Sequence, residues 1–382
     1  WWGERAHCDF CGLNGLNMAF RAMTPEKAIG QFREMFSYAG RCARIESVDS
    51  IMPRNYCREV FPFVETPPSV KIFYEVKTDL SEEDIRVLSQ SGIKLVQPGI
   101  EALATSTLRL MHKGTTVFHN IAFLRRCVQY DVHPMWNLLI GFPGESVDVY
   151  EKYLEDIPRL FHLPPPTGVQ RVRFDRYSPY FEQSARYGLD LAPFDFYGLV
   201  FPFRDESIRK MAYYFLSRDL DTGDADSLDG WAESLEEVVQ RWRGRWYGDA
   251  AVAPRLYLRQ EGDVAAVVDT RAGSELTFRL TATGLELLQL SMTPVRISKV
   301  SGKLGYRDRD AIDSELAKLA EHGLVFREND TMLSLVFAEQ PSDPFYRSCG
   351  VSRYRSKCGG EGQPRGGLAS TFFRPLSSRR SW

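Results

Sequence analysis

Short apolar runs alternate with helical stretches from about residue 20 to residue 215, and this alternation leaves few folds open to the chain. The runs are rich in Val, Ile, Leu, Phe and Tyr, as buried parallel strands are. They are Cys42–Val48, Lys71–Val76, Lys94–Ile100, Met135–Phe142 and Val172–Tyr177. Strand–helix units repeated at roughly 25–40 residues indicate a parallel α/β sheet, open or closed into a barrel.

Two of the intervening helices have recognisable beginnings. Thr24 is followed by Pro25, which is typical of an N-cap with proline at the first helical position. Ser81 precedes three consecutive acidic residues, as expected of a cap followed by a first turn that favours negative charge. Further helices are predicted over Thr115–Tyr130 and Asp148–Phe161.

Polar side chains lie where the predicted strands end. They are Asp49, Lys77, Glu101, Asn137 and Arg176. The carboxyl ends of strands carry the site in parallel α/β folds. Any one of these residues is equally well explained as the solvated start of a loop, but five in succession favour a site.

Composition excludes several classes of protein. The 382 residues hold 48 Lys+Arg against 50 Asp+Glu, a net charge of −2, which argues against a dedicated nucleic-acid or membrane-surface binder. The hydrophobic fraction of 43% supports a packed core and excludes disorder for most of the chain. No apolar run reaches the roughly 18 residues of a membrane span, and no signal peptide is visible. We therefore expect a cytoplasmic protein with no nucleic-acid or membrane partner.

Cysteine usage points to reduced thiols. The seven cysteines are Cys8, Cys11, Cys42, Cys57, Cys127, Cys349 and Cys358. An odd number without a signal peptide does not indicate a disulfide framework. Cys42, Cys57 and Cys127 are isolated and are interpreted as small hydrophobes. Only Cys8 and Cys11 are close enough to act together.

A Cys-x-x-Cys pair fits zinc, a redox dithiol or an iron–sulfur cluster. Zinc requires two more ligands at a similar spacing, and Cys42 and Cys57 are not paired in that way. A thioredoxin-type pair opens a helix, whereas Gly12–Gly15 is a loop sequence. A cluster with one open iron requires a third thiolate. None lies nearby in the chain, so we expect it before Trp1.

The chain is expected to divide into four parts. A hairpin over residues 255–269, two helical patterns and a second hairpin over residues 324–337 indicate a small winged-helix-like module. The tail is rich in Ser, Arg, Gly and Pro, which indicates disorder. The predicted parts are a core barrel at 1–220, a helical linker at 221–250, the module at 251–338 and the tail at 339–382.

A series of motifs carries a family resemblance. Trp1-Trp2-Gly3-Glu4 followed by His7-Cys8-Asp9-Phe10-Cys11-Gly12-Leu13-Asn14-Gly15 resembles the cluster loop of radical SAM enzymes. More narrowly, it resembles the cobalamin-dependent C-methyltransferases that mature ribosomally made peptides (RiPPs). The resemblance covers about residues 1–338 and continues, in order, through Phe73-Tyr74-Glu75-Val76-Lys77, Gln97-Pro98-Gly99-Ile100-Glu101, Leu110–Gly114, Trp136–Glu145, His162–Pro166, Asp175–Phe181 and Asp269-Thr270-Arg271.

This resemblance implies a fold, a reaction and a set of cofactors. The fold is α/β, a partial (β/α)6 TIM-like barrel that lacks its first strand, followed by the winged-helix-like module. Cys8 and Cys11 are implied to be catalytic ligands of a 4Fe–4S cluster that binds S-adenosylmethionine (SAM) and generates a 5′-deoxyadenosyl radical. The implied outcome is C-methylation of a precursor peptide, as in bacteriocin biosynthesis, with cobalamin as a further cofactor and a flavodoxin- or ferredoxin-type protein as reductant.

The resemblance also implies roles for individual residues. Glu101 suits the ribose or ammonium group of SAM, although an acid at a helix N-terminus is an alternative. Lys77 suits a carboxylate. Gly99 and Gly141 permit close approach of the backbone to a nucleotide, and Phe10 is expected near the adenine. The predicted cofactor-binding residues are Phe10, Asp49, Lys77, Gly99, Glu101, Asn137, Gly141 and Arg176.

The chain departs from the family pattern at its beginning. The first cluster cysteine would immediately precede Trp1, and a cobalamin-binding domain would precede the barrel. The chain is thus expected to be N-terminally truncated, with an exposed strand edge, inactive and poorly behaved. Two other interpretations stay open: a cobalamin-independent radical SAM peptide cyclase or oxidase, and a non-catalytic protein that binds a precursor peptide through the C-terminal module.

Overall fold

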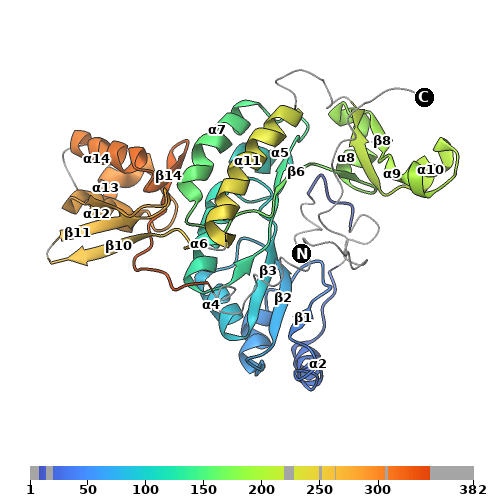
Figure 1. Cartoon of the computed structure of the whole chain (residues 1–382), viewed down its shortest axis with the longest axis horizontal. Helices are drawn as coiled ribbons and strands as arrows, with labels where there is room; N and C mark the ends of the chain where they lie inside the picture. Colours follow the sequence, from blue (N-terminus) through green and yellow to red (C-terminus); the bar gives the residue numbers. More distant parts are fainter. Residues whose placement is uncertain are drawn as a thin grey trace. The chain divides into compact units, whose positions relative to one another are not determined.

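Four parallel strands form one sheet in the order β1-β2-β3-β4, which is also their order in the chain. The computed structural model describes residues 8–13, 20–218, 228–248, 252–262, 264–305 and 309–344. The strands are β1 (Arg44–Glu46), β2 (Lys71–Val76), β3 (Ile93–Pro98) and β4 (His133–Pro134). Figure 1 shows the first three side by side. The predicted α/β fold with a parallel sheet is confirmed.

Helices join these strands, and two of them begin where the sequence predicts. Thr24 caps the first, where its side chain accepts a bond from the Lys27 N–H. Ser81 and Asp84 form a reciprocal capping box at the start of another, with N–H···O distances of 3.1 and 2.9 Å. The helices are α2 (Pro25–Phe36), α3 (Tyr56–Glu59), α4 (Glu82–Gln90), α5 (Thr105–Leu110) and α6 (Val117–Gln129).

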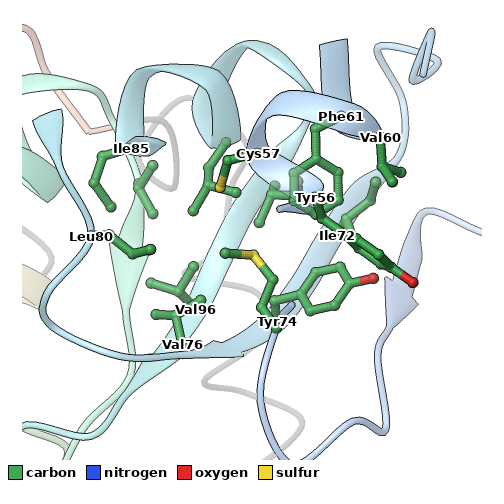
Figure 2. Packing of buried hydrophobic residues seen from close by; sticks show 14 of the residues in the cluster. Tyr56, Cys57, Val60, Phe61, Ile72, Tyr74, Val76, Leu80, Ile85 and Val96 are labelled. Carbon is green, nitrogen blue, oxygen red and sulfur yellow. The ribbon is translucent and has the colours of Figure 1, made fainter. Parts of the chain in front are cut away.

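One hydrophobic core fills the space between this sheet and its helices. Phe61 is buried in this core, with its ring 5.9 Å from that of Tyr56 and 5.7 Å from that of Tyr74 (Figure 2). Burial of each large side chain contributes about 1.5–3 kcal/mol. Cys57 and Cys127 are buried in this core, as their isolated positions in the sequence suggested, whereas Cys42 is exposed, so the interpretation of Cys42 as a small buried hydrophobe was wrong. The labelled members are Tyr56, Cys57, Val60, Phe61, Ile72, Tyr74, Val76, Leu80, Ile85 and Val96.

The predicted strand at 135–142 is interrupted. β4 ends at Pro134, and β5 (Leu138–Ile140) pairs instead with β6 (Val169–Arg171), in parallel. Between them the indole of Trp136 is buried and donates to the Pro164 carbonyl at 3.2 Å. This turn moves the chain from one sheet to the next, so the described parallel strands form a four-stranded and a two-stranded sheet rather than one.

Only two residues of the predicted strand at 172–177 form a strand, and they join an antiparallel sheet. β7 (Phe174–Asp175) pairs antiparallel with β9 (Tyr214–Ser217), which pairs with β8 (Leu191–Pro193). This sheet has its own core, which includes Phe174, Tyr180 and Phe215. The intervening short helices are α8 (Pro179–Glu182), η3 (Ser184–Tyr187), α9 (Phe196–Val200) and α10 (Asp205–Met211).

A long helix, α11 (Leu228–Tyr247), packs along α7 (Asp148–Asp156) and the short η2 (Ile157–Leu160). Its Trp242 and Trp246 are fully buried, and their indole N–H groups donate to the carbonyls of Leu163 and Phe161 at 2.8 and 2.7 Å. These two tryptophans therefore pack in the interior.

Residues 252–337 contain two antiparallel three-stranded sheets. The first is the predicted hairpin with a third strand added, and the second has the order β13-β15-β14. A parallel bridge between Tyr257 and Phe337 links them. The elements are β10 (Leu256–Glu261), β11 (Val264–Asp269), β12 (Leu276–Arg279), α12 (Ala282–Leu290), β13 (Val295–Arg296), η5 (Ile297–Lys299), α13 (Val300–Leu304), α14 (Arg309–Glu321), β14 (Val325–Glu328) and β15 (Thr331–Ser334).

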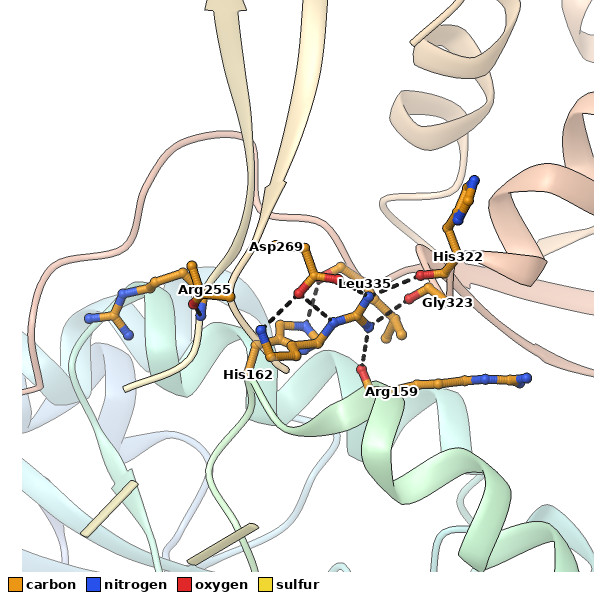
Figure 3. Close-up of polar contacts among 9 residues, drawn as sticks. Arg159, His162, Arg255, Asp269, His322, Gly323 and Leu335 are labelled. Atoms are coloured by element: carbon orange, nitrogen blue, oxygen red, sulfur yellow. Dashed lines mark hydrogen bonds and ion pairs between the residues drawn. The ribbon is translucent and has the colours of Figure 1, made fainter. Parts of the chain in front are cut away.

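Arg271 joins these sheets to η2. Its guanidinium pairs with Asp269 through two bonds, of 2.7 and 2.9 Å. It also donates to the carbonyls of Arg159, Gly323 and His322 at 2.7, 2.8 and 3.0 Å (Figure 3). The sequence singled out Asp269-Thr270-Arg271 only as part of a resemblance, and the structure shows its physical role.

Several expectations fall on residues outside the described ranges. They concern residues 1–7 and 14–19, the beginning of the linker, the two cysteines of the tail and the tail itself from residue 345. Of the preceding residues, Ser342 and Asp343 accept bonds from Arg255. No helix among the described residues is long and apolar enough to cross a membrane.

Candidate cofactor site

The Cys8–Cys11 loop is held from two sides by main-chain bonds. The Asp9 N–H donates to the Met111 carbonyl at the end of α5 (3.1 Å), and the Asp9 carbonyl accepts from the N–H of Tyr180 in α8 (3.0 Å). Within the loop the Cys11 N–H donates to the Cys8 carbonyl at 3.1 Å. The two predicted ligands thus lie on one tight turn whose position is set by distant elements.

Both thiols are half-buried, and burial raises the pKa of each. The positive charge of Lys113 acts in the opposite direction on both. No group of three or more His, Cys, Asp or Glu side chains among the described residues forms a metal site. The loop therefore fits as the source of two thiolate ligands, and the third thiolate that an open-iron cluster needs is not among the described residues.

Gly12 allows the loop to lie against the end of β7. A Cβ at this position would stand 2.1 Å from the Arg176 carbonyl oxygen and 3.0 Å from the Tyr213 hydroxyl. The carbonyl belongs to the main chain and cannot rotate away. Glycine is therefore required here for close approach, which is a constraint that the sequence motif alone did not explain.

A buried ion pair lies beside the loop. Lys113 Nζ is 2.9 Å from Glu101 Oε1, with side-chain exposures of 15% and 21%. Burial works against the charge of Lys113, but the negative charges of Glu101 and Cys8 outweigh it, and the pKa of Lys113 is raised. The ammonium group also lies 5.4 Å from the centre of the Phe10 ring. Gly99 leaves room for this pair, since a Cβ there would be 2.8 Å from Lys113 Nζ.

The residues that follow β1, β2 and β3 lie at the carboxyl-terminal edge of the parallel sheet. Lys77 follows β2, and burial lowers its pKa to about 8, against the opposing effects of Asp79 and Cys8. Glu101 follows β3 and adopts a left-handed φ of 58°. Asp49 follows β1, where it is exposed and accepts a bond from the Ser47 hydroxyl at 2.8 Å. Cys8 is near enough to both Lys77 and Glu101 for their charges to act on the pKa of its thiol.

The loop after β5 is organised by a carboxylate that the sequence did not single out. Glu145 Oε2 accepts from the Gly141 N–H at 2.9 Å, the Phe142 N–H at 3.2 Å and the Tyr150 hydroxyl at 2.7 Å. Its other oxygen accepts from Thr107 at 2.6 Å. Burial raises the pKa of Glu145 despite these bonds. Gly141 has a left-handed φ of 82°, a conformation that favours glycine.

Three predicted site residues have surroundings that the sequence did not foresee. Asn137 precedes β5 and is exposed, so placing it at a strand's carboxyl end was wrong. Arg176 does follow β7, but its guanidinium donates to the carbonyls of Ala212 and Arg209 at 2.6 and 2.5 Å. Phe10 packs edge-on against Phe142, with ring centres 6.0 Å apart.

Sequence reasoning missed three residues that shape the site. Asp9 is buried between the cysteines, Lys113 pairs with Glu101, and Glu145 holds the loop after β5. Lys113 and Glu145 stand inside motifs that carried the resemblance, which was the available signal. Asp9 had no signal, because nothing in a Cys-x-x-Cys pattern tells whether an intervening acid is buried.

Comparison with protein-family models matches residues 5–157 to the model described as the radical SAM superfamily. A search among curated proteins found no match. Among solved structures, the chain is similar to TsrM from Kitasatospora setae, a radical SAM methyltransferase solved with cobalamin and a 4Fe–4S cluster. The identity is 20%, the match covers 40% of this chain and 30% of that one, and the TM-score is 0.34.

Two further similarities cover more of the chain. HemN from Escherichia coli, a coproporphyrinogen III oxidase, is 14% identical over 86% of this chain and 83% of that one, with a TM-score of 0.32. The cobalamin-dependent OxsB is 13% identical over 83% and 44%, with a TM-score of 0.34. The chain spans about a third of TsrM. Residues 5–157 thus match the radical SAM superfamily model, and a domain of that family implies a 4Fe–4S cluster and SAM as cofactors.

Proposed function

We propose that this chain is the SAM-cleaving part of a radical SAM enzyme that C-methylates a ribosomally made precursor peptide. The observation that carries the proposal is the Cys8–Cys11 loop, set beside the Lys113–Glu101 pair at the carboxyl ends of parallel strands. This is the edge at which α/β folds bind cofactors. The match to the radical SAM superfamily supports the SAM-cleaving step, and the motif resemblance supports the peptide and the methyl transfer.

In this proposal the chain's own residues bind and orient the cofactors. Cys8 and Cys11 supply two thiolates to the cluster. Lys77, at the end of β2, faces the carboxylate of SAM, and Glu101, at the end of β3, faces its ribose or ammonium group. Lys113 pairs with the Glu101 carboxylate and holds it in place. When bound, the cluster supplies the electron that cleaves SAM, and the protein supplies position and a dry site.

The methyl carrier and the partners are part of the proposal. Cobalamin would serve as the methyl carrier, and a flavodoxin- or ferredoxin-type protein would serve as the electron donor. The precursor peptide contacts the C-terminal module. The order of elements from α12 to β15, a helix, a strand, two helices and a hairpin, supports a winged-helix-like module for this role. Such folds accept a peptide as an added strand.

The first test is reductive cleavage of SAM. The chain is reconstituted anaerobically with iron and sulfide, reduced with dithionite, and assayed for 5′-deoxyadenosine. The Cys8→Ala/Cys11→Ala variant is the matched control. Product that requires both cysteines supports the proposal, whereas an intact cluster that forms no product with SAM refutes it.

The second test addresses methyl transfer. SAM with a deuterated methyl group and hydroxocobalamin are added, together with peptides translated from short reading frames beside the gene. A labelled methyl group on a peptide carbon supports C-methylation. Peptide cyclisation or oxidation without label, at the same rate with and without cobalamin, would replace it with the cobalamin-independent alternative.

A further inference from the structure

Asp9 lies between the two cysteines in the sequence and is almost fully buried, with 5% of the residue exposed. Its Oδ2 is 2.7 Å from His112 Nδ1 and accepts from the Tyr187 hydroxyl at 3.0 Å. A carboxylate in such a place is stable only when it is hydrogen-bonded. The two partners come from separate parts of the chain: His112 follows α5, and Tyr187 is the last residue of η3.

The main chain of Asp9 bonds to the same two parts of the chain as its side chain does. Its N–H donates to the Met111 carbonyl and its carbonyl accepts from the Tyr180 N–H. Tyr180 in turn donates to the Leu110 carbonyl at 3.3 Å, and its ring lies 4.7 Å from that of Tyr187. Asp9 is thus held by four hydrogen bonds, two to the segment at the end of α5 and two to the α8–η3 segment, and these two segments also contact each other.

The three residues of the segment Met111–Lys113 all contact the Cys8–Cys11 loop. His112 has a left-handed φ of 50°, which is unfavourable for a residue with a Cβ and persists only where the surroundings require it. Its ring is largely exposed, and yet Nδ1 faces Asp9. All three residues serve the loop: Met111 through its carbonyl, His112 through its ring, and Lys113 through its contact with Phe10.

We propose that Asp9 is the positioning residue of the Cys8–Cys11 loop, and that its carboxylate, clamped by His112 and Tyr187, fixes the two thiols in the orientation that receives the iron–sulfur cluster. The inference rests on the proposed function for its purpose, but the clamp itself is a property of the chain without cofactor. Asp9 touches no reacting atom and acts only through Cys8 and Cys11.

The clamp is tested first on the chain without a cluster, by hydrogen exchange and mass spectrometry of residues 8–13. Asp9→Ala removes both side-chain bonds and is expected to exchange about 10- to 30-fold faster in this loop. Tyr187→Phe removes one bond and is expected to be intermediate. Asp9→Asn keeps an oxygen at the same place and is expected to stay close to wild type. Tyr130→Phe, which breaks an exposed bond to Glu82 (2.7 Å), is the matched control.

Two exchange results would overturn the proposal. One is an Asp9→Ala loop that exchanges no faster than that of Tyr130→Phe. The other is faster exchange of the β2 and β3 peptides by the same factor, which would show general destabilisation.

Iron content and the electron paramagnetic resonance spectrum of the reduced cluster, with and without SAM, provide the second readout. Asp9→Ala is expected to lower iron content and alter the spectrum, with recovery in Asp9→Asn. A wild-type spectrum in Asp9→Ala would contradict a role in orienting the thiols. If the wild-type chain holds an intact cluster that forms no product with SAM, the proposed function fails, while the exchange result still decides the clamp.

Discussion

Removal of the Arg271 side chain is expected to be among the most destabilising single changes in this chain. The side chains of Arg271 and Asp269 are only 8% and 10% exposed. The guanidinium makes five hydrogen bonds, two to Asp269 and three to main-chain carbonyls. Arg271→Ala leaves the buried Asp269 carboxylate without its counter-ion. Breaking a buried pair in this way costs about 3–5 kcal/mol of unfolding free energy.

The expected loss of unfolding free energy in Arg271→Ala is compared with the loss from breaking an exposed ion pair in the same region. Arg259 and Glu275 are 3.1 Å apart with side chains 37% and 56% exposed, so Arg259→Ala is expected to cost less than about 1 kcal/mol. Arg271→Met/Asp269→Asn removes both charges and is expected to be more stable than Arg271→Ala.

Urea unfolding of the full chain, followed by the fluorescence of the buried tryptophans, measures all three variants. The reasoning is refuted if Arg271→Ala and Arg259→Ala lose similar stability. It is also refuted if the double variant is less stable than Arg271→Ala. The unpaired Asp269 charge would then not be the cause of the lost stability.

Three further predictions concern the site and the response to acid. Gly12→Ala is expected to cost about 1–3 kcal/mol and to loosen the Cys8–Cys11 loop, because its Cβ would overlap a main-chain oxygen; Gly30→Ala, with open space around it in α2, is the control in thermal melts. Lys113→Met is expected to cost about 2–4 kcal/mol in urea, with part of the loss recovered when Glu101→Gln is added, since the half-shielded carboxylate is then neutral. Burial holds the pKa of His162 well below its usual 6.5, so below that pH the unfolded chain binds a proton that the native state does not. Stability therefore falls on acidification through this window, by up to about 1.4 kcal/mol per pH unit from this residue, and His162→Gln should reduce the slope between about pH 7 and about pH 5. An unchanged slope would contradict that assignment.

Local features of the fold were predictable because their causes lie within a few residues. Thr24 and Ser81 cap their helices as expected, since capping needs only a side-chain oxygen and the next turn. The strand β2 is observed at Lys71–Val76, the predicted span. The hairpin at 255–269 was also predictable, because both of its strands and its turn are contiguous.

The structure departs from the predicted strands where consecutive strands pair in different sheets. Nothing in the apolar run 135–142 shows that β4 pairs with β3 while β5 pairs with β6. The antiparallel pairing of β7 with β9 depends on residues about forty positions away, so the run 172–177 could not reveal it. Asn137 was misplaced for the same reason: its position relative to a strand end follows from pairing, not from composition.

The candidate site likewise contains residues that the sequence identified and residues that only the tertiary structure revealed. Cys8, Cys11, Lys77 and Glu101 were identifiable from the sequence, because thiols at a ligand spacing and charged residues after buried strands are themselves the chemical signal. Only the tertiary structure decided which groups neutralise and hold them. Asp9, His112 and Tyr187 meet over more than a hundred residues of chain, and Gly12 is constrained by a carbonyl from β7's far end. Residue type is a property of sequence, whereas burial, and therefore the need for a partner, arises only when distant segments pack.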